Sequence, residues 1–408
     1  MKLKVLILSF LFPNPVQPNY GIFVYNRIQA LQEFGDIRVI APLQWYPFRD
    51  RLRPELAGIS RVGRVENLGS LEAHYPRFPI VPRYMKWFDA ISYFFAVLPV
   101  VRQLKKSSFD FDLVDVHWTY PDILAGYLLS RMAKKPFIVT IRGRGALYLE
   151  EKSARKWLLD VLLRRADGVV ALSSELAGLA AAIGVSPDRI SVVLNGVDIG
   201  NFNPISREDA RAELNLPQKR KVILSVGRLT EAKGHQHIIA ALPALADNHD
   251  VELHIIGGIN PESDYSVALR DLIGKLRLDN VHIHHDVPHA QLAAWYNAAD
   301  LFCLASHGEG CPNVVLESLA CGTPVVVTNV GAVGDIIEIG RNGFIVNDVD
   351  TLPAALDTGL STRWEREVIA EKMVAMSWQS CAMKVNGIYR DTVSHCIGSM
   401  EFSKGAIL

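Results

Sequence analysis

The stretch SHGEGCPNVVLESLACGTPVVVT, residues 306–328, carries signals for a loop, a helix and a strand in direct succession. Pro312 and Asn313 are both typical of a helix start. Proline is common at the first helical position, and asparagine is common as the N-terminal cap. The residues 314–320 continue this helix, and Gly322 is typical of the residue that ends one. The run 324–327 predicts a buried strand of a parallel sheet. A helix that leads into such a strand is typical of an α/β fold.

The same stretch carries two carboxylates, Glu309 and Glu317, around the helix start. The N-terminus of a helix offers backbone N–H groups without intrahelical acceptors, together with positive potential. Amides of this kind bind phosphate, and carboxylates accept hydrogen bonds from sugar hydroxyls. The stretch therefore predicts a site for a nucleotide sugar.

Short β-branched runs alternate with helical patterns along the whole chain. The expected strands form two series, residues 5–9, 37–41, 113–116, 137–140, 168–172 and 191–194, then residues 222–226, 251–256, 281–284, 301–304 and 324–327. They predict an α/β protein with two doubly wound, Rossmann-like parallel-sheet domains facing across a cleft. We place these domains at residues 1–200 and 201–375, and expect the helical tail 376–408 to cross back to the first.

The charge of the chain is divided unevenly. Residues 1–200 carry 26 Lys and Arg against 18 Asp and Glu, whereas residues 201–408 carry 17 against 25, so the net charge of the whole chain is zero. The positive first half, with basic pairs at 105–106, 134–135 and 164–165, indicates peripheral contact with an anionic membrane or a phosphorylated lipid. Complementary charges on the two domain surfaces would explain the same pattern.

Other bulk features favour a cytoplasmic protein, and the charge pattern adds the prediction of peripheral contact with the inner face of the membrane. The five cysteines have no metal-ligand spacing and an odd number, which favours a reducing compartment. The N-terminal MKLKVLILSFLFPNP lacks the small-residue cleavage site of a signal peptide, so we interpret residues 4–10 as the first strand. The apolar run 90–101 is far shorter than the roughly 20 residues that span a bilayer, and no transmembrane helix is expected.

A second motif, VGRLTEAKGH, follows the expected strand 222–226. Gly227 permits a tight turn, and Gly234 opens the next helix. Arg228 and Lys233 can neutralise a diphosphate. The motif matches neither the Walker pattern nor the G-x-G-x-x-G fingerprint. Basic residues after a strand are most often surface charges, but together with the two carboxylates they indicate a phosphate loop.

In combination, these motifs resemble the retaining GT-B glycosyltransferases of family 4 (glycosyl transferases group 1), in the branch that builds bacterial surface and exported polysaccharides. Matching pieces cover nearly the whole chain: FPNPVQPNYGIFV, DVHWTYPD, LNGVD, VGRL with KG, AADLF, EGCPNVVLE and GTPVV. The resemblance implies an N-terminal acceptor domain and a C-terminal donor domain. It also implies transfer of a hexosyl unit from a nucleoside diphosphate sugar to a saccharide acceptor, expected to be lipid-linked, with retention of configuration.

The resemblance also assigns roles by matching position. Glu317 is expected to bind the ribose hydroxyls, and Glu309 to lie beside the transferred sugar. Arg228 and Lys233 are expected to hold the diphosphate and to stabilise the charge on the leaving group, so no metal and no other cofactor is expected. The remaining donor contacts are expected from Gly21, Gly227, Val287 beside the base, Gly310, Asn313 and Val314.

The resemblance assigns roles to the acceptor-side residues less directly than to the donor residues. His117 stands at the end of the expected strand 113–116, where we expect it to contact the acceptor or the donor sugar as a catalytic residue. Trp118 and Tyr120 either shape the acceptor pocket or belong to the core. Arg142 stands where many relatives have histidine. It cannot be a general base but can contact a diphosphate or an anionic acceptor, and Arg144 stands where relatives often have an acid.

Other hypotheses stay open at this point. A nucleotide-sugar epimerase or phosphorylase needs an acid–base pair that the sequence does not reveal. A non-catalytic nucleotide-sugar-binding protein would keep the donor residues without turnover. Asp110 and Asp112 form a D-x-D, which holds a metal in other folds, but we interpret them as solvated residues before a strand. No nucleic-acid partner is expected.

Overall fold

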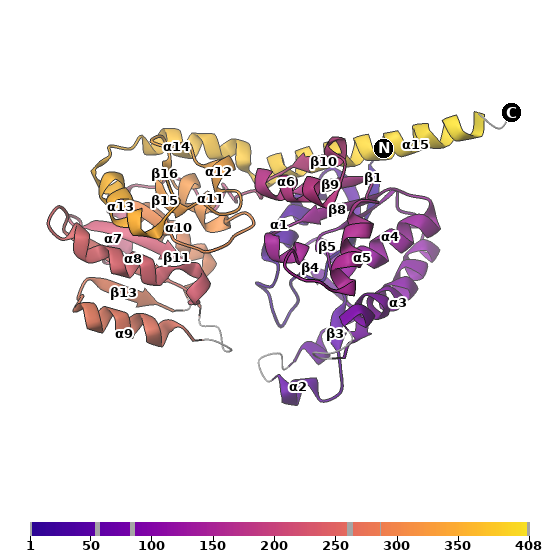
Figure 1. Ribbon diagram of the computed structural model, residues 1–408, viewed down its shortest axis with the longest axis horizontal. Helices are drawn as coiled ribbons and strands as arrows, with labels where there is room; N and C mark the ends of the chain where they lie inside the picture. The colour runs from indigo at the N-terminus through magenta and orange to yellow at the C-terminus, as the bar shows by residue number, and fades with distance from the viewer. Residues whose placement is uncertain (1, 54–57, 82–85, 259–263, 286, 406–408) are drawn as a thin grey trace. The chain divides into compact units, whose positions relative to one another are not determined.

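The computed structural model describes residues 2–53, 58–81, 86–258, 264–285 and 287–405. The chain divides into two compact units, each described by itself below (Figure 1). The N-terminal unit comprises Met1–Asn195 together with Trp378–Leu408, and the C-terminal unit comprises Gly196–Ser377. The chain passes from one unit to the other between Asn195 and Gly196, and returns between Ser377 and Trp378.

The N-terminal unit is built on an eight-stranded sheet in the order β10-β9-β8-β7-β1-β2-β5-β4. The pairing is parallel except between β4 and β5, which are antiparallel. Strands β7 to β9 are buried at every residue, which explains their mainly apolar sequence, and Asp115 and Thr140 are the buried polar residues in them. The strands are β1 (Leu3–Leu8), β2 (Gly35–Ile40), β4 (Val65–Leu68), β5 (Leu71–His74), β7 (Leu113–Val116), β8 (Phe137–Ile141), β9 (Gly168–Ala171) and β10 (Ile190–Val192), with a separate pair, β3 (Leu43–Trp45) and β6 (Arg77–Pro79).

The last helix of the chain, α15, packs into the N-terminal unit (Figure 1). Its Trp378, Ala382 and Tyr389 share one core with Val24 and Ile28 of α1. The unit is therefore completed by residues that follow the C-terminal unit in sequence. Its helices are α1 (Ile22–Leu31), α2 (Arg49–Leu52), α3 (Lys86–Lys106), α4 (Asp122–Ala133), α5 (Ala154–Leu163), α6 (Ser174–Ile183) and α15 (Trp378–Gly405).

The C-terminal unit is built on a six-stranded sheet in the order β13-β12-β11-β14-β15-β16, with parallel pairing throughout. The strands are β11 (Lys221–Val226), β12 (Val251–Ile256), β13 (Val281–His284), β14 (Leu301–Leu304), β15 (Val325–Thr328) and β16 (Gly343–Val346). The helices are α7 (Arg207–Glu213), α8 (His235–Ala241), α9 (Ser266–Leu276), α10 (Leu292–Ala298), α11 (Asn313–Ala320), α12 (Val333–Ile336), α13 (Leu352–Ser361) and α14 (Arg366–Met373). The strand order changes direction at β11 and β14, so ligands are expected beyond the carboxyl ends of these two strands.

The predicted fold class is confirmed, because both units are Rossmann-like layers of helices around a mainly parallel sheet. Every strand predicted from an apolar run is present within a few residues of its expected bounds. The sequence analysis missed β3 to β6 and β16. Strands β3 and β6 have only three residues each, and β4 and β5 alternate with charged or polar residues, so none of them forms a continuous apolar run.

Within the described part of the chain, no helix has both the length and the apolar character needed to cross a bilayer. The apolar run 90–101 lies in the amphipathic helix α3. Tyr93 and Val97 are buried on one side of this helix, whereas Phe95 is 62% exposed on the other.

Candidate active site

Glycine fixes the loop that follows β11. Gly234 has a left-handed φ of 72° at the junction of the short helix η5 (Glu231–Lys233) and α8. A Cβ at this position would overlap the backbone carbonyl of Ala305, which follows β14. Glycine alone combines this φ with such a close approach. The loop is therefore held against the end of β14, and Lys233 lies at the carboxyl ends of two adjacent strands.

Lys233 and Glu309 form an ion pair, although 76 positions separate them. Lys233 Nζ lies 2.6 Å from Glu309 Oε1, and the two side chains are only 23% and 14% exposed. Ser306 Oγ donates a hydrogen bond to the same oxygen at 2.8 Å. Gly331, with φ of 58°, packs closely against the carbonyl oxygens of Glu309 and Gly310. Both the side chain and the backbone of Glu309 are thus fixed.

Helix α11 starts differently from the prediction. Pro312 is its cap residue, Asn313 is its first helical residue, and no side chain hydrogen-bonds the cap position. The prediction of Asn313 as the cap is wrong, because the cap must precede the first helical residue. Asn313 and Val314 instead lie in the first turn, where backbone N–H groups have no intrahelical acceptor.

The end of α11 agrees with the prediction. Gly322 has φ of 73°, and its N–H donates to the Leu319 carbonyl at 2.9 Å. The Thr323 N–H donates to the Ser318 carbonyl at the same distance. This pair of bonds is the Schellman pattern that closes a helix at glycine.

Glu317 lies on α11 and is 8% exposed. Its Oε2 accepts a hydrogen bond from Tyr296 Oη at 2.9 Å, and its Oε1 lies 3.3 Å from His289 Nε2. The hydrogen bond with Glu317 raises the pKa of His289, and burial followed by the Glu317 charge raises the pKa of Tyr296 well above its usual value. The ring of Phe202 contacts both partners edge-on. The Glu317 carboxylate is therefore preoriented before any ligand binds.

The sequence analysis missed Tyr296 and His289. Tyr296 lies on α10, and His289 lies in η7 (His289–Gln291), which leads into it. Their spacing of seven residues places them on one face of a continuous helical segment. That spacing was the available signal, but aromatic residues at helical spacing are usually core residues.

The other predicted donor residues also lie in the C-terminal unit. Gly227 follows β11 directly, and Arg228 is exposed, without a described side chain paired to its guanidinium. Val287 is half-buried between β13 and η7, two positions before His289. The structure therefore groups the predicted donor residues of this unit around β11, β14 and α11, except Val287, which follows the edge strand β13.

Gly21 belongs to the N-terminal unit, and the local backbone explains why this position is a glycine. It caps α1 with a left-handed φ of 72°, and a Cβ there would lie 2.6 Å from the carbonyl oxygen of Leu11. The close approach of two backbone segments thus requires glycine at this position. Its expected contact with a diphosphate stays a prediction.

His117 follows β7 and is fully buried. Its Nδ1 lies 2.7 Å from Arg142 Nη2, and its Nε2 lies 2.8 Å from Asp115 Oδ2. Because a guanidinium only donates, Nδ1 must accept and the proton must sit on Nε2, toward Asp115. Burial lowers the pKa of His117 against the opposing effect of Asp115, which keeps the ring neutral. Tyr389 of α15 also donates to Asp115.

Arg142 follows β8 and is 6% exposed. Its Nη1 lies 3.4 Å from Asn195 Oδ1, an oxygen that also accepts from Arg27, and its guanidinium lies 5.4 Å from the centre of the Phe23 ring. Burial, followed by the charge of Arg27, lowers the pKa of Arg142. Two buried guanidinium groups thus share one neutral acceptor, Asn195 Oδ1, and the charge of Asp115 acts on the pKa of Arg142 in the opposite direction to that of Arg27.

The remaining acceptor-side candidates lie near the surface of the same unit. Arg144 is 56% exposed and pairs with Glu175, while Trp118 is half-buried and Tyr120 is buried. The D-x-D residues contact lysines: Asp110 lies 3.5 Å from Lys105, and Asp112 lies 3.6 Å from Lys135. These ion pairs are consistent with structural rather than metal-binding carboxylates.

Two family models match the chain in succession. Residues 21–201 match Glycosyltransferase Family 4, and residues 206–373 match Glycosyl transferases group 1. The chain is 30% identical over 314 residues to a D-inositol 3-phosphate glycosyltransferase of Arthrobacter sp., covering 72% of this chain and 74% of the relative. It is 27% identical over 378 residues to the putative teichuronic acid biosynthesis glycosyltransferase TuaC of Bacillus subtilis, covering 91% and 92%.

Solved structures share the fold of the whole chain. Sucrose-phosphate synthase from Thermosynechococcus elongatus superposes with a TM-score of 0.75 at 20% identity, covering 96% of this chain and all of that one. Anabaena Alr3699/HepE in complex with UDP gives a TM-score of 0.70 at 18% identity, covering 95% and 100%. The family predicted from the sequence motifs is thus confirmed: the chain belongs to the group 1 glycosyltransferases, enzymes of the GT-B fold with a family 4 N-terminal region.

Proposed function

We propose that this glycosyltransferase moves a hexosyl unit from a nucleoside diphosphate sugar to a lipid-linked saccharide, with retention of anomeric configuration and without a catalytic metal. The observation that carries the proposal is the grouping of Lys233, Glu309 and Glu317 at the carboxyl ends of β11 and β14. A role in cytoplasmic surface-polysaccharide synthesis is supported by the similarity to TuaC along nearly the whole chain.

On the donor side, Glu317 accepts hydrogen bonds from the ribose hydroxyls. The diphosphate lies between Lys233, Arg228 and the first-turn amides of α11, where positive charge stabilises the leaving group as its bond to the sugar breaks. Glu309 holds Lys233 in place before binding and lies beside the transferred sugar. The UDP bound in the structural relative Alr3699/HepE supports this class of donor.

On the acceptor side, the arrangement of His117 supports retention. Both ring nitrogens already face a partner, Arg142 and Asp115, and the ring is fully buried. A general base needs a free lone pair within reach of the substrate proton, which this ring does not offer. The leaving diphosphate therefore takes the proton of the incoming hydroxyl on the same face of the sugar, and the configuration is kept.

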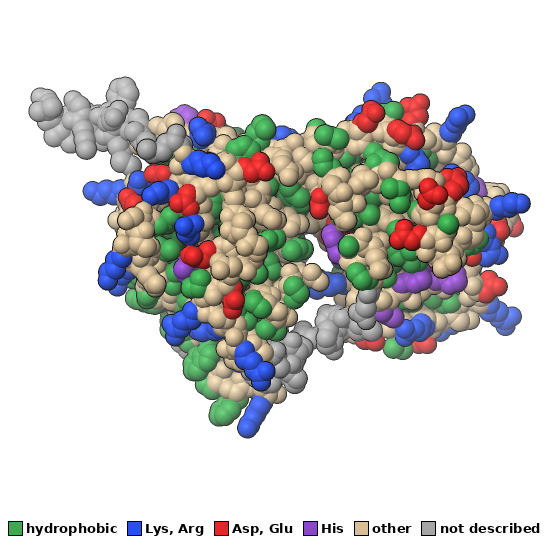
Figure 2. Space-filling model, turned by 180° about the vertical axis from the view of Figure 1, so that it is seen from behind, with side chains coloured by type: hydrophobic (Ala, Val, Ile, Leu, Met, Phe, Trp, Pro, Cys, Tyr) green, Lys and Arg blue, Asp and Glu red, His purple; other side chains and the backbone are tan. Residues whose placement is uncertain are grey.

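A lipid-linked acceptor requires access to a membrane, and exposed aromatic side chains of the N-terminal unit support this access. Trp45 is 50% exposed, Phe48 71%, Trp87 49% and Phe95 62%. Strand β6 pairs with β3, which carries Trp45, and contacts α3, which carries Trp87 and Phe95. Figure 2 shows hydrophobic and basic side chains exposed beside one another on this unit. Aromatic side chains with neighbouring basic ones are typical of an anionic membrane surface.

A donor screen tests the enzymatic proposal. The melting temperature is measured with a panel of nucleotide sugars. Transfer to lipid-linked saccharide acceptors is measured with the same panel, with and without EDTA, well below the melting temperature. We expect one donor class to bind and to be consumed equally in EDTA, and Glu309→Gln to lower turnover much more than donor affinity. Glu338→Gln, an exposed acid of the same unit paired with Lys372, serves as the matched control.

The other hypotheses predict different outcomes in the same screen. Donor binding without transfer to any acceptor indicates a non-catalytic binding protein, and isomerised donor sugar indicates an epimerase. For the membrane, we expect sedimentation with anionic vesicles at low salt, weakened in Phe48→Ser and unchanged in Trp157→Ser, whose side chain is 66% exposed on α5. Absence of sedimentation, or equal loss in both variants, would contradict the membrane proposal.

A further inference from the structure

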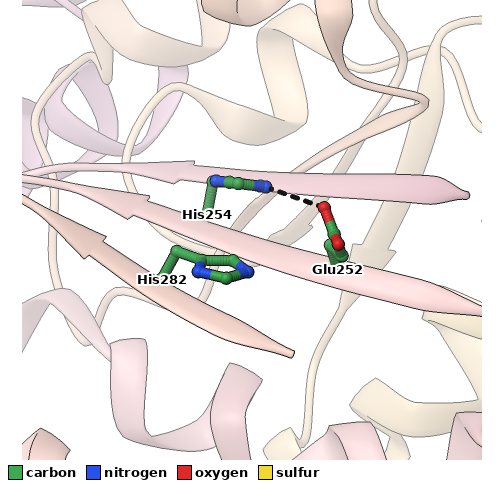
Figure 3. Close-up of side chains that lie close together, drawn as sticks. All are labelled: Glu252, His254 and His282. Atoms are coloured by element: carbon green, nitrogen blue, oxygen red, sulfur yellow. Dashed lines mark hydrogen bonds and ion pairs between the residues drawn. The ribbon is translucent and has the colours of Figure 1, made fainter. Parts of the chain in front are cut away.

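The C-terminal unit carries a group of metal-ligating side chains outside the donor residues, at the edge of its sheet (Figure 3). Glu252 and His254 alternate on β12, so they point to one face of the sheet. His282 is the register partner of His254 on β13, the edge strand, and points to the same face. One ligand atom from each of the three side chains lies within 4.8 Å of the others.

We propose that Glu252, His254 and His282 bind one divalent transition metal ion, with zinc as the best match. Two imidazole nitrogens and one carboxylate oxygen suit zinc, whereas magnesium and calcium prefer oxygen ligands alone. Metal–ligand bonds of about 2.0–2.1 Å in a tetrahedral site place neighbouring ligand atoms about 3.4 Å apart. His254 Nε2 and Glu252 Oε2 are already 3.4 Å apart. Closing the site requires a shift of His282, the most exposed of the three.

In both buried ligands, Glu252 and His254, a neighbouring side chain contacts one polar atom and leaves the other directed at the proposed ion. Arg220 Nη1 donates to Glu252 Oε1 at 2.8 Å, so Oε2 is the oxygen directed toward His254. His284 Nε2 lies 3.0 Å from His254 Nδ1, so Nε2 is the nitrogen that faces Glu252. A partner on the other ring nitrogen fixes the tautomer and orientation of a metal-binding histidine. His284 and Arg220 are therefore positioning residues.

Ring packing holds the histidines in these orientations. The ring of His254 is stacked against those of His282 and His284, with centroid distances of 4.8 and 5.3 Å. Trp295 of α10 packs on His254 and His284 at 5.2 and 4.6 Å. Figure 2 shows histidine side chains gathered on one face of the C-terminal unit. Because packing holds His254 in place, this ligand loses little side-chain entropy when the ion binds, and His282 is the ligand that moves.

The bound ion would connect β12 to the edge strand β13. Three protein ligands leave a fourth position for water. Because the metal binds the folded chain, it stabilises the C-terminal unit against unfolding. None of the donor residues takes part, so the proposal does not depend on the proposed function.

Equilibrium dialysis of the full chain against zinc tests this site after metal is stripped with a chelator. We expect one zinc per chain, a rise in melting temperature with zinc, and the visible absorption of a tetrahedral site when cobalt replaces zinc. His282→Ala and Glu252→Gln should weaken binding by more than about 100-fold, and His284→Ala by about 10- to 100-fold, the range for a residue that orients a ligand. His307→Ala, which alters a different histidine pair of the same unit, should bind zinc like the wild-type chain.

Three results would overturn the proposal. The first is a wild-type chain that binds no zinc. The second is a His282→Ala chain that melts like the wild type without metal and still binds zinc within about threefold of the wild-type affinity. The third is loss of binding in His307→Ala alone, which would place the ion at the His237–His307 pair instead. Comparing the melting temperatures of all variants without metal separates loss of a ligand from loss of the fold.

Discussion

Replacing Glu317 by alanine should weaken donor binding far more than it lowers turnover at saturating donor. The carboxylate is 8% exposed and already oriented by Tyr296 and His289. A hydrogen bond to a charged acceptor contributes about 1.5–3 kcal/mol. For two ribose hydroxyls we expect a loss of about 3–6 kcal/mol, which raises the Kd of the nucleoside diphosphate by roughly two to four powers of ten.

Titration calorimetry with the nucleoside diphosphate identified in the donor screen measures this loss. The 2′-deoxy form of the same ligand lacks one of the hydroxyls, so Glu317→Ala should reduce the affinity for the deoxy ligand less than that for the ribose ligand. The difference between these two losses is the coupling energy between Glu317 and the missing hydroxyl. Tyr296→Phe keeps the carboxylate and should cost less than tenfold. Glu338→Ala is the surface control. Because Glu317→Ala leaves the Tyr296 hydroxyl buried without this acceptor, at a cost of about 1–3 kcal/mol, the titration is run well below the melting temperature of each variant.

Two outcomes would refute the assignment of Glu317 to the ribose. The first is an equal loss of affinity for the ribose and 2′-deoxy ligands, which would show that the carboxylate acts through the fold and not through a hydroxyl. The second is an equal loss of donor affinity in Glu309→Ala and Glu317→Ala, because Glu309 is assigned to the reacting sugar and should chiefly lower kcat.

Two further predictions concern stability. The hydrogen bond with Glu317 raises the pKa of His289 above 6.5, so its stabilisation is present below the unfolded pKa and is lost as pH rises through the folded pKa. The difference in the free energy of unfolding between the wild type and His289→Ala, measured with urea, should therefore shrink from pH 6 to pH 8. Because His289 is 60% exposed, this difference should not exceed about 1 kcal/mol. A difference that grows with pH would contradict the predicted direction. Gly234→Ala should destabilise by about 1–2 kcal/mol for its positive φ and about 1–3 kcal/mol for overlap with Ala305. Gly340→Ala, at φ of 76° in open space, should show only the first cost, and equal melting temperatures for the two variants would refute the role of the close contact.

The sequence predicts the sheet interiors well because buried parallel strands leave a simple signature. The runs 251–256 and 301–304 match β12 and β14 residue for residue, since every position in these strands is buried and apolar or internally paired. The short pair β3 and β6 leaves no such signature. Trp45 and Pro79 are exposed register partners there, and three residues are too few to show a period.

The proximity of Lys233 and Glu309, two of the predicted site residues, was predictable for a related reason. Lys233 and Glu309 each lie in a loop directly after a strand, and the carboxyl ends of adjacent parallel strands meet at one edge of the sheet. The hydrogen bond from Tyr389 to Asp115 was not predictable, because it joins residues 274 positions apart and depends on the return of α15 to the N-terminal unit. The sequence suggests that helix but does not show where it packs.

The cluster around His117 shows how one substitution redefines a site. A histidine in place of Arg142 offers either a donor or an acceptor, so Nδ1 of His117 would be free to donate or to accept. Arg142 only donates, which directs the proton of His117 toward Asp115 and uses the remaining lone pair. With Arg27 beside it, Arg142 also adds positive charge to the buried region around Asp115. In the proposed reaction, this arrangement removes a candidate base and leaves the proton transfer to the departing diphosphate, so the basic groups of the donor site, Lys233 above all, carry the electrostatic stabilisation.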